Sequence, residues 1–141
     1  NIMSIKDGWK SSTFSSHSKT QKESSNRVIM DEVNIRGHMI YYKDLLDGTK
    51  KVVNLYQKKH PYMKYFLPQF CTDFRVNRYS KGGFMSEHTD NIHHSHKQKY
   101  GFPHGSILFF LNDDYEGGEF IIADNIYKPK KNSSIIFLES S

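Results

Sequence analysis

The tripeptide His88-Thr89-Asp90 places an imidazole and a carboxylate two positions apart in the chain. Side chains alternate faces along a β-strand, so residues i and i+2 point to the same side. If a strand runs through the tripeptide, His88 and Asp90 converge on one point. A histidine and a carboxylate are members of the 2-His-1-carboxylate triad, which holds non-haem Fe(II) and leaves coordination positions open. The tripeptide alone is a weak signal, and the rest of the chain must support it.

The second half of the chain is typical of short strands joined by turns. Phe74, Val76 and Arg78 are expected on one face of a strand, and the polar residues between them on the other. The residues of that other face are Asp73, Arg75, Asn77 and Tyr79. Ser80 to Gly83 predicts a turn, and a second strand is expected from Phe84 to Asp90. Further strands are expected over residues 106–111, 119–123 and 134–138. Several short strands at even spacing favour a sandwich or barrel.

The first half of the chain is expected to support this β-structure. Trp9 is expected to open a first strand and to anchor it to the core, and residues 11–26 read as a loop. Residues 27–70 are predicted to be helical. The clearest helix is expected from about Lys50 to His60, capped by Thr49 and stopped by Pro61. The fold class is therefore mainly β with N-terminal helices.

Length and charge limit the classes of protein. A chain of 141 residues fits one domain, so residues 1–141 are expected to form a single domain. The net charge of +5 and the pI near 9.2 are typical of a lysine-rich solvated surface or of a protein with an anionic partner. Nucleic acid stays open as a partner but is not favoured, and the sequence predicts no oligomeric state.

Cysteine usage and hydropathy bear on the compartment. With Cys71 as the one cysteine, no disulfide can form within the chain, and a reducing, cytoplasmic location is the expectation. No apolar run approaches the ~20 residues that span a bilayer, so no membrane association is expected. The usage of Lys, Asn and Ile is typical of an AT-rich genome and suggests a viral or phage origin.

Five short pieces over residues 71–141 occur in an order that resembles the prolyl 4-hydroxylase branch of the Fe(II)/2-oxoglutarate-dependent dioxygenases. Each piece alone is unspecific, whereas the ordered set is specific. The pieces are Arg78-Tyr79-x-x-Gly82, His88-Thr89-Asp90, Phe109-Phe110-Leu111-Asn112, Tyr115-x-Gly117-Gly118-Glu119, and Pro129 followed by Ile135-Ile136-Phe137.

The resemblance implies a double-stranded β-helix, or jelly-roll, core over residues 71–141, with residues 1–70 as N-terminal loop and helical support. It implies His88 and Asp90 as catalytic Fe(II) ligands and Tyr79 as a residue that binds 2-oxoglutarate through its hydroxyl. O2 is the second cosubstrate, and ascorbate is expected to assist. The implied activity is hydroxylation of a prolyl residue in a peptide or protein. Phe110 stands where some relatives carry a tyrosine that touches the cosubstrate, and Phe110 cannot make that hydrogen bond.

The family pattern also requires a second histidine after the last strand and, further on, a lysine or arginine for the far carboxylate of 2-oxoglutarate. We expect both to lie beyond Ser141, with the chain truncated at its C-terminus. Two alternatives stay open. The domain could be a degenerate relative without catalysis, or a histidine of the polar loop could complete the iron site. The loop candidates are His93, His94, His96 and His104.

Two other functions stay open on the same residues. One is a non-catalytic, basic jelly-roll module that binds a peptide or nucleic acid. The other is a small-molecule hydroxylase, because a fold does not determine a substrate. Asp90 argues against a halogenase, since a halide would need the carboxylate's position at the metal.

Overall fold

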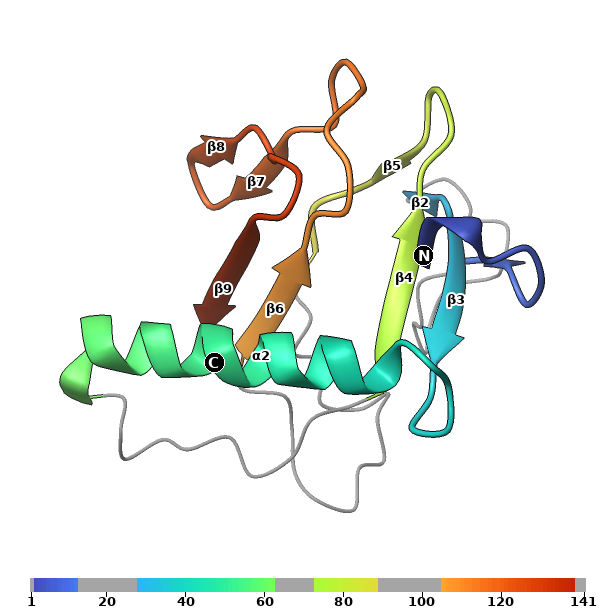
Figure 1. The fold of residues 1–141 in the computed structure, drawn as a ribbon. Coiled ribbons are helices and arrows are strands. Elements are labelled where there is room, and N and C mark those ends of the chain that lie inside the picture. Colours follow the sequence, from blue (N-terminus) through green and yellow to red (C-terminus); the bar gives the residue numbers. More distant parts are fainter. Residues whose placement is uncertain (1, 13–27, 63–72, 89–104, 139–141) are drawn as a thin grey trace, which may run out of the picture.

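The computed structural model describes residues 2–12, 28–62, 73–88 and 105–138. Within these ranges most elements are strands, which confirms the mainly β class (Figure 1). The described strands form separate small sheets, and the jelly roll stays a prediction. The elements are η1 (Ile2–Ser4), β1 (Lys10–Ser11), β2 (Val28–Ile29), β3 (Asp31–Ile35), α2 (Tyr42–Lys59), β4 (Phe74–Arg78), β5 (Phe84–Met85), β6 (Gly105–Phe109), β7 (Phe120–Ile122), β8 (Asn125–Tyr127) and β9 (Ser134–Leu138).

The β1-β3-β4 sheet carries the best-buried core among the described residues. β3 lies between β1 and β4 and is antiparallel to both. On β3, Val33 and Ile35 are buried, with Ile35 fully excluded from solvent, and Val33 pairs with Val76 of β4. Val28 and Met30 complete this buried group. Burial at i and i+2 makes one face of the sheet apolar, as strand geometry requires.

The prediction that residues 27–70 are helical is wrong for residues 28–35, which form β2 and β3. The segment contains Val28, Ile29, Val33 and Ile35, and β-branched residues favour strands because they pack well on a pleated surface. The uneven spacing of the apolar residues in this segment concealed the alternation of buried and exposed positions that is typical of a strand. β3 adopts the strand conformation because it pairs with β4 over five residues. A local sequence pattern cannot reveal this pairing, since β4 lies about 40 residues further along the chain.

Helix α2 runs from Tyr42 to Lys59 and is therefore longer than the predicted helix. Thr49 does not cap it. Its hydroxyl donates instead to the Leu45 carbonyl at 2.8 Å, inside the helix. Gly48 also lies inside, at a cost of about 1 kcal/mol relative to alanine, which the packing of the helix outweighs. In the described part of the chain, no helix is both long and apolar enough to cross a membrane.

Helix α2 crosses both groups of strands (Figure 1). At its start, the Tyr42 ring meets Phe74 of β4 edge-on, with centroids 5.5 Å apart. Helix residues between Asp44 and Leu55 line a groove of about 420 Å³ against Phe109 to Leu111 and Asn132 to Ser134. The helix therefore bridges the N-terminal sheet and the β6-β9 pair.

The C-terminal strands pair as β6 with β9 and β7 with β8, both antiparallel. The Phe120 ring of β7 lies 6.2 Å from Phe110 and 6.1 Å from Phe137 between centroids, which holds the β7-β8 hairpin to the β6-β9 pair. The predicted strands over 106–111, 119–123 and 134–138 are confirmed within one or two residues. The sequence did not predict β8, and the residues of β6 after Gly105 are half-buried.

Candidate functional site

Tyr79 directly follows the last residue of β4 and leads into the predicted turn. The turn is closed by the Gly83 amide, which donates to the Ser80 carbonyl at 2.8 Å. Gly82 has a φ of +80°, a conformation that glycine adopts without steric cost. The turn brings the chain from β4 back into β5 and toward His88.

Gly83 fits the turn closely against β2. A Cβ atom there would stand 2.9 Å from the carbonyl oxygens of both Ile29 and Ser80. β5 then pairs with β2 through Val28 with Met85 and Ile29 with Phe84. The strand that leads to His88 is therefore held by a partner from the first half of the chain.

The strand predicted from Phe84 to Asp90 ends at Met85, and His88 lies in irregular backbone three residues later. This part of the prediction is wrong for residues 86–88, which lie outside the strand: β5 pairs with β2 through Phe84 and Met85 only. Asp90 lies outside the described residues, so its approach to His88 stays a prediction. The same holds for His93, His94, His96 and His104. Within the described ranges, no group of three or more His, Cys, Asp or Glu side chains is placed to hold a metal.

The ring of His88 is exposed and oriented by its own backbone. Its Nδ1 atom lies 2.7 Å from the Ser86 carbonyl oxygen. A carbonyl oxygen can only accept, so Nδ1 carries the proton and donates it to this contact. In the neutral ring the lone pair then sits on Nε2, the arrangement in which metal-bound histidines are held by a hydrogen bond from the other nitrogen. His88 therefore fits the role of a metal ligand through Nε2.

Tyr79 is 48% exposed and presents a neutral phenol. Burial of the remainder raises the pKa of Tyr79 above its ordinary value, and the positive charge of Arg75 lowers this pKa in part. The hydroxyl consequently keeps its proton at neutral pH and can donate a hydrogen bond to a carboxylate. Tyr79 therefore fits the role predicted for it with 2-oxoglutarate.

The residue that sequence reasoning missed is Arg75. Strand alternation already placed Arg75, Asn77 and Tyr79 on one face, yet no role followed for the arginine. In the structure, Arg75 Nη1 lies 3.1 Å from Glu32 Oε2 on the neighbouring strand β3. An arginine on the same face as Tyr79 is a group that can bind a carboxylate. The alternation of the strand, combined with charge, was the signal that could have found it.

Residues 74–141, just under half of the chain, match the family model of the 2OG-Fe(II) oxygenase superfamily. No curated protein and no solved structure matches the chain. The match supports a 2-oxoglutarate-dependent oxygenase, for which the superfamily implies Fe(II), 2-oxoglutarate and O2 and a β-sandwich core. It does not distinguish the prolyl 4-hydroxylase branch.

Proposed function

We propose, from the premise that residues 74–141 match the 2OG-Fe(II) oxygenase superfamily, that this protein hydroxylates a prolyl residue in a peptide or protein. The observation that carries the proposal is the Nδ1 contact of His88 with Ser86, because it prepares Nε2 for a metal within the matched segment. His88 and Asp90 are proposed as ligands of Fe(II), with a further histidine as the third ligand. Tyr79 is proposed to bind 2-oxoglutarate.

Bound Fe(II) supplies the oxidative decarboxylation of 2-oxoglutarate to succinate and CO2 by O2, with the second oxygen atom inserted into a substrate C–H bond. The protein's own contribution is to fix the ligands and to position the cosubstrate. The backbone carbonyl of Ser86 fixes the tautomer of His88. The Tyr79 hydroxyl donates to a carboxylate oxygen and so orients the 2-oxoglutarate chain. Ascorbate is proposed to restore the reduced metal after uncoupled turnover.

Succinate release and substrate oxidation test the proposal together. The full-length protein is incubated with Fe(II), 2-oxoglutarate, ascorbate and proline-containing peptides, and the peptides are examined for the mass of one added oxygen atom. His88→Ala is expected to abolish both succinate release and Mn(II) binding. His60→Ala is the matched control, because it also removes a histidine ring but lies outside the matched segment. His60 is the C-cap of helix α2, and its ring packs on Tyr56, with centroids 4.6 Å apart.

The outcomes separate the candidate functions. Succinate without an oxidised peptide would retain the oxygenase and overturn the prolyl substrate, and small molecules would be the next substrates. Absence of both metal binding and succinate release in the full-length protein would overturn the enzyme and favour a binding module. If that module bound nucleic acid through its basic charge, its affinity would fall steeply with salt.

A further inference from the structure

The β7-β8 hairpin presents two isoleucines to solvent, opposite each other on its outer face. Ile121 of β7 pairs with Ile126 of β8, and the two residues are 62% and 68% exposed. Phe120 points to the other side, where its ring meets Phe110 and Phe137, as the alternation of side chains along a strand requires. The hairpin is therefore packed on one face and leaves a pair of apolar side chains uncovered on the other.

Exposed carboxylates border this isoleucine pair. Glu119 lies directly before β7, and Asp124 lies in the turn between β7 and β8. Glu116, in the loop that precedes the hairpin, adds a third exposed carboxylate. None of the ion pairs among the described residues involves any of the three. The chain as a whole carries a net charge of +5, so this acidic border is a local feature that favours a cationic partner.

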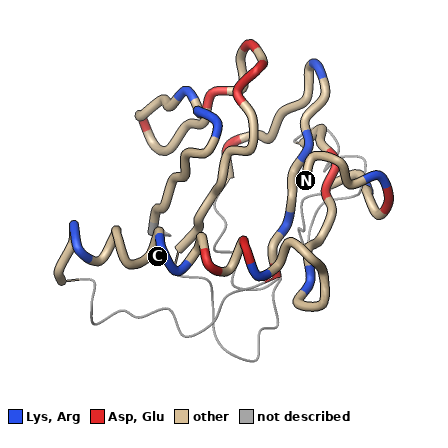
Figure 2. Tube along the Cα trace, in the orientation of Figure 1, with Lys and Arg blue, Asp and Glu red and all other residues tan. Residues whose placement is uncertain are grey.

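The loop before β7 is held beside the hairpin by the residues that follow β8. Lys128 donates to the Gly117 carbonyl at 2.6 Å, and its ammonium lies 5.1 Å from the centre of the Tyr115 ring. The Lys131 amide donates to Asp113 at 3.2 Å. Figure 2 shows acidic residues along this loop, next to the hairpin. The cation that follows β8 is therefore directed to the backbone of the loop and leaves the bordering carboxylates to a ligand.

The size and the edges of this face favour a short peptide over a folded partner. Two isoleucine side chains cover far less than the roughly 800 Å² that each partner contributes to a stable protein–protein interface, so they would not hold a second copy of the chain. Each strand of the hairpin also has one edge without a partner strand in the described part of the chain. An extended peptide can bond to such an edge and place alternate side chains on the neighbouring face.

We propose that the outer face of the β7-β8 hairpin docks an apolar segment of the substrate that is flanked by lysine or arginine. The apolar side chain covers Ile121 and Ile126, and the flanking cations lie at Glu119 and Asp124. The proposal rests on the proposed function and gives it a substrate class, a basic peptide that contains proline. The face lies apart from the residues proposed to bind Fe(II) and 2-oxoglutarate, so it raises substrate affinity without changing the chemical step.

Three fluorescein-labelled peptides of equal length, each with one proline, test the proposed class without turnover. The first alternates lysine and leucine, the second has glutamate in place of lysine, and the third has serine in place of leucine. Fluorescence anisotropy with the full-length protein measures their affinities. The lysine–leucine peptide is expected to bind about tenfold or more tightly than either of the others. Its affinity is expected to fall with added salt, because salt screens the attraction between lysine and carboxylate.

A double variant, Ile121→Ser with Ile126→Ser, tests the apolar part of the face. It is expected to weaken binding of the lysine–leucine peptide about tenfold, because the leucines no longer cover apolar area. In the oxidation assay it is expected to raise KM for this peptide and to leave kcat unchanged. Ile40→Ser is the matched control, because Ile40 is 82% exposed and lies outside the hairpin. It is expected to change neither the affinity nor KM.

A second double variant, Glu119→Gln with Asp124→Asn, tests the acidic border. It is expected to weaken binding of the lysine–leucine peptide about two- to fivefold and to flatten the salt dependence. Asp73→Asn is the control, because Asp73 is an exposed carboxylate directly before β4, outside the hairpin. Asp73→Asn is expected to leave the affinity unchanged.

The outcomes distinguish the inference from the function beneath it. Equal binding of the three peptides, or unchanged affinity in the double isoleucine variant, would overturn the inference alone, as would an equal loss in Ile40→Ser. If the double isoleucine variant instead converted a wild-type dimer to a monomer and kept its peptide affinity, the face would be a contact between copies. A wild-type protein that neither binds Mn(II) nor releases succinate would overturn the proposed function. Peptide binding that the isoleucine variant loses would then still support the docking surface.

Discussion

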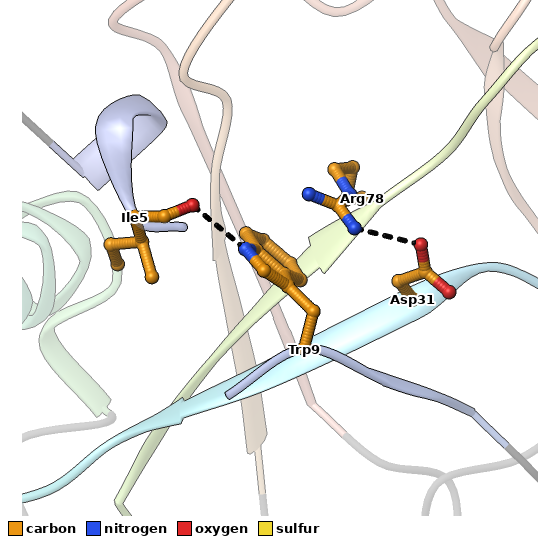
Figure 3. Close-up of polar contacts among 4 residues, drawn as sticks. All are labelled: Ile5, Trp9, Asp31 and Arg78. Carbon is orange, nitrogen blue, oxygen red and sulfur yellow. Dashed lines mark hydrogen bonds and ion pairs between the residues drawn. The ribbon is translucent and has the colours of Figure 1, made fainter. Parts of the chain in front are cut away.

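Trp9 and Arg78 are expected to stabilise the fold as a coupled pair, although Trp9 lies far outside the segment matched to the oxygenase superfamily. The Arg78 guanidinium stands 4.0 Å from the centre of the Trp9 ring. Trp9 also donates its indole N–H to the Ile5 carbonyl at 2.9 Å, and Arg78 pairs with Asp31 at 2.9 Å (Figure 3). Arg78 is thus held between an aromatic ring and a carboxylate, immediately before Tyr79.

The size of the coupling follows from these contacts. A cation over an aromatic ring contributes about 0.5–1 kcal/mol at an exposed site. The ion pair with Asp31 is exposed and contributes about 0.2–1 kcal/mol, and the indole hydrogen bond contributes about 0.5–1.5 kcal/mol. Trp9→Leu and Arg78→Met each lose the ring contact and one further interaction. The double variant is therefore expected to be less destabilised than the sum of the two by about 0.5–1 kcal/mol.

Urea denaturation of the wild-type protein, both single variants and the double variant measures this coupling as a double-mutant cycle. Trp9→Leu combined with Arg75→Met is the control cycle, because Arg75 lies on the other face of β4, and its coupling is expected to be near zero. If the Trp9–Arg78 coupling is no larger than that of the control, the N-terminal segment does not hold β4 through this contact, and the reasoning fails.

Three further predictions concern the turn, the tyrosine and the hairpin. Gly83→Ala is expected to cost about 1–3 kcal/mol in urea denaturation, because its Cβ would meet two backbone oxygens at 2.9 Å. Gly82→Ala is expected to cost only about 1–2 kcal/mol from its positive φ, and the reverse order would contradict the described turn. Because the pKa of Tyr79 is raised, its hydroxyl stays protonated, so 2-oxoglutarate affinity should hold up to about pH 10 and fall above it. A decline at lower pH that Tyr79→Phe removes would refute this. Phe120→Ala should destabilise by about 2 kcal/mol or more because its ring meets two others. Ile121→Ala, at 62% exposure, should cost about 0.5 kcal/mol or less, and equal losses would contradict the packing of the hairpin.

The parts of the fold that could be predicted from sequence are those that local chemistry determines. The turn at Ser80 to Gly83 follows from its glycines, and the strands over 106–111 and 134–138 follow from their apolar runs bounded by turn residues. The parts that could not be predicted depend on distant partners. Residues 28–35 become strands because β4 and β5 pair with them, and Gly48 stays helical because α2 packs on strands far along the chain.

The candidate site shows the same division. His88 and Tyr79 could be identified as candidate site residues from the sequence, since they occur in the order of a known family pattern. The position of His88 could not, because strand alternation applies only within a paired strand, and β5 ends at Met85. The protonation of His88 at Nδ1 depends on a backbone contact with Ser86 that no residue type encodes. Arg75 was visible in the alternation, but its relation to Glu32 required the register of β3 against β4.

The pairing of the strands indicates why the first half of the chain matters for chemistry assigned to the second. The matched segment begins at residue 74, yet both strands that lead to the candidate residues have their partners before it. β4, which ends before Tyr79, pairs with β3, and β5, which leads to His88, pairs with β2. Strands that lack a partner leave backbone groups without hydrogen bonds, so neither would hold its geometry alone. The positions of Tyr79 and His88 therefore depend on residues 28–35 as directly as on the segment that resembles an oxygenase.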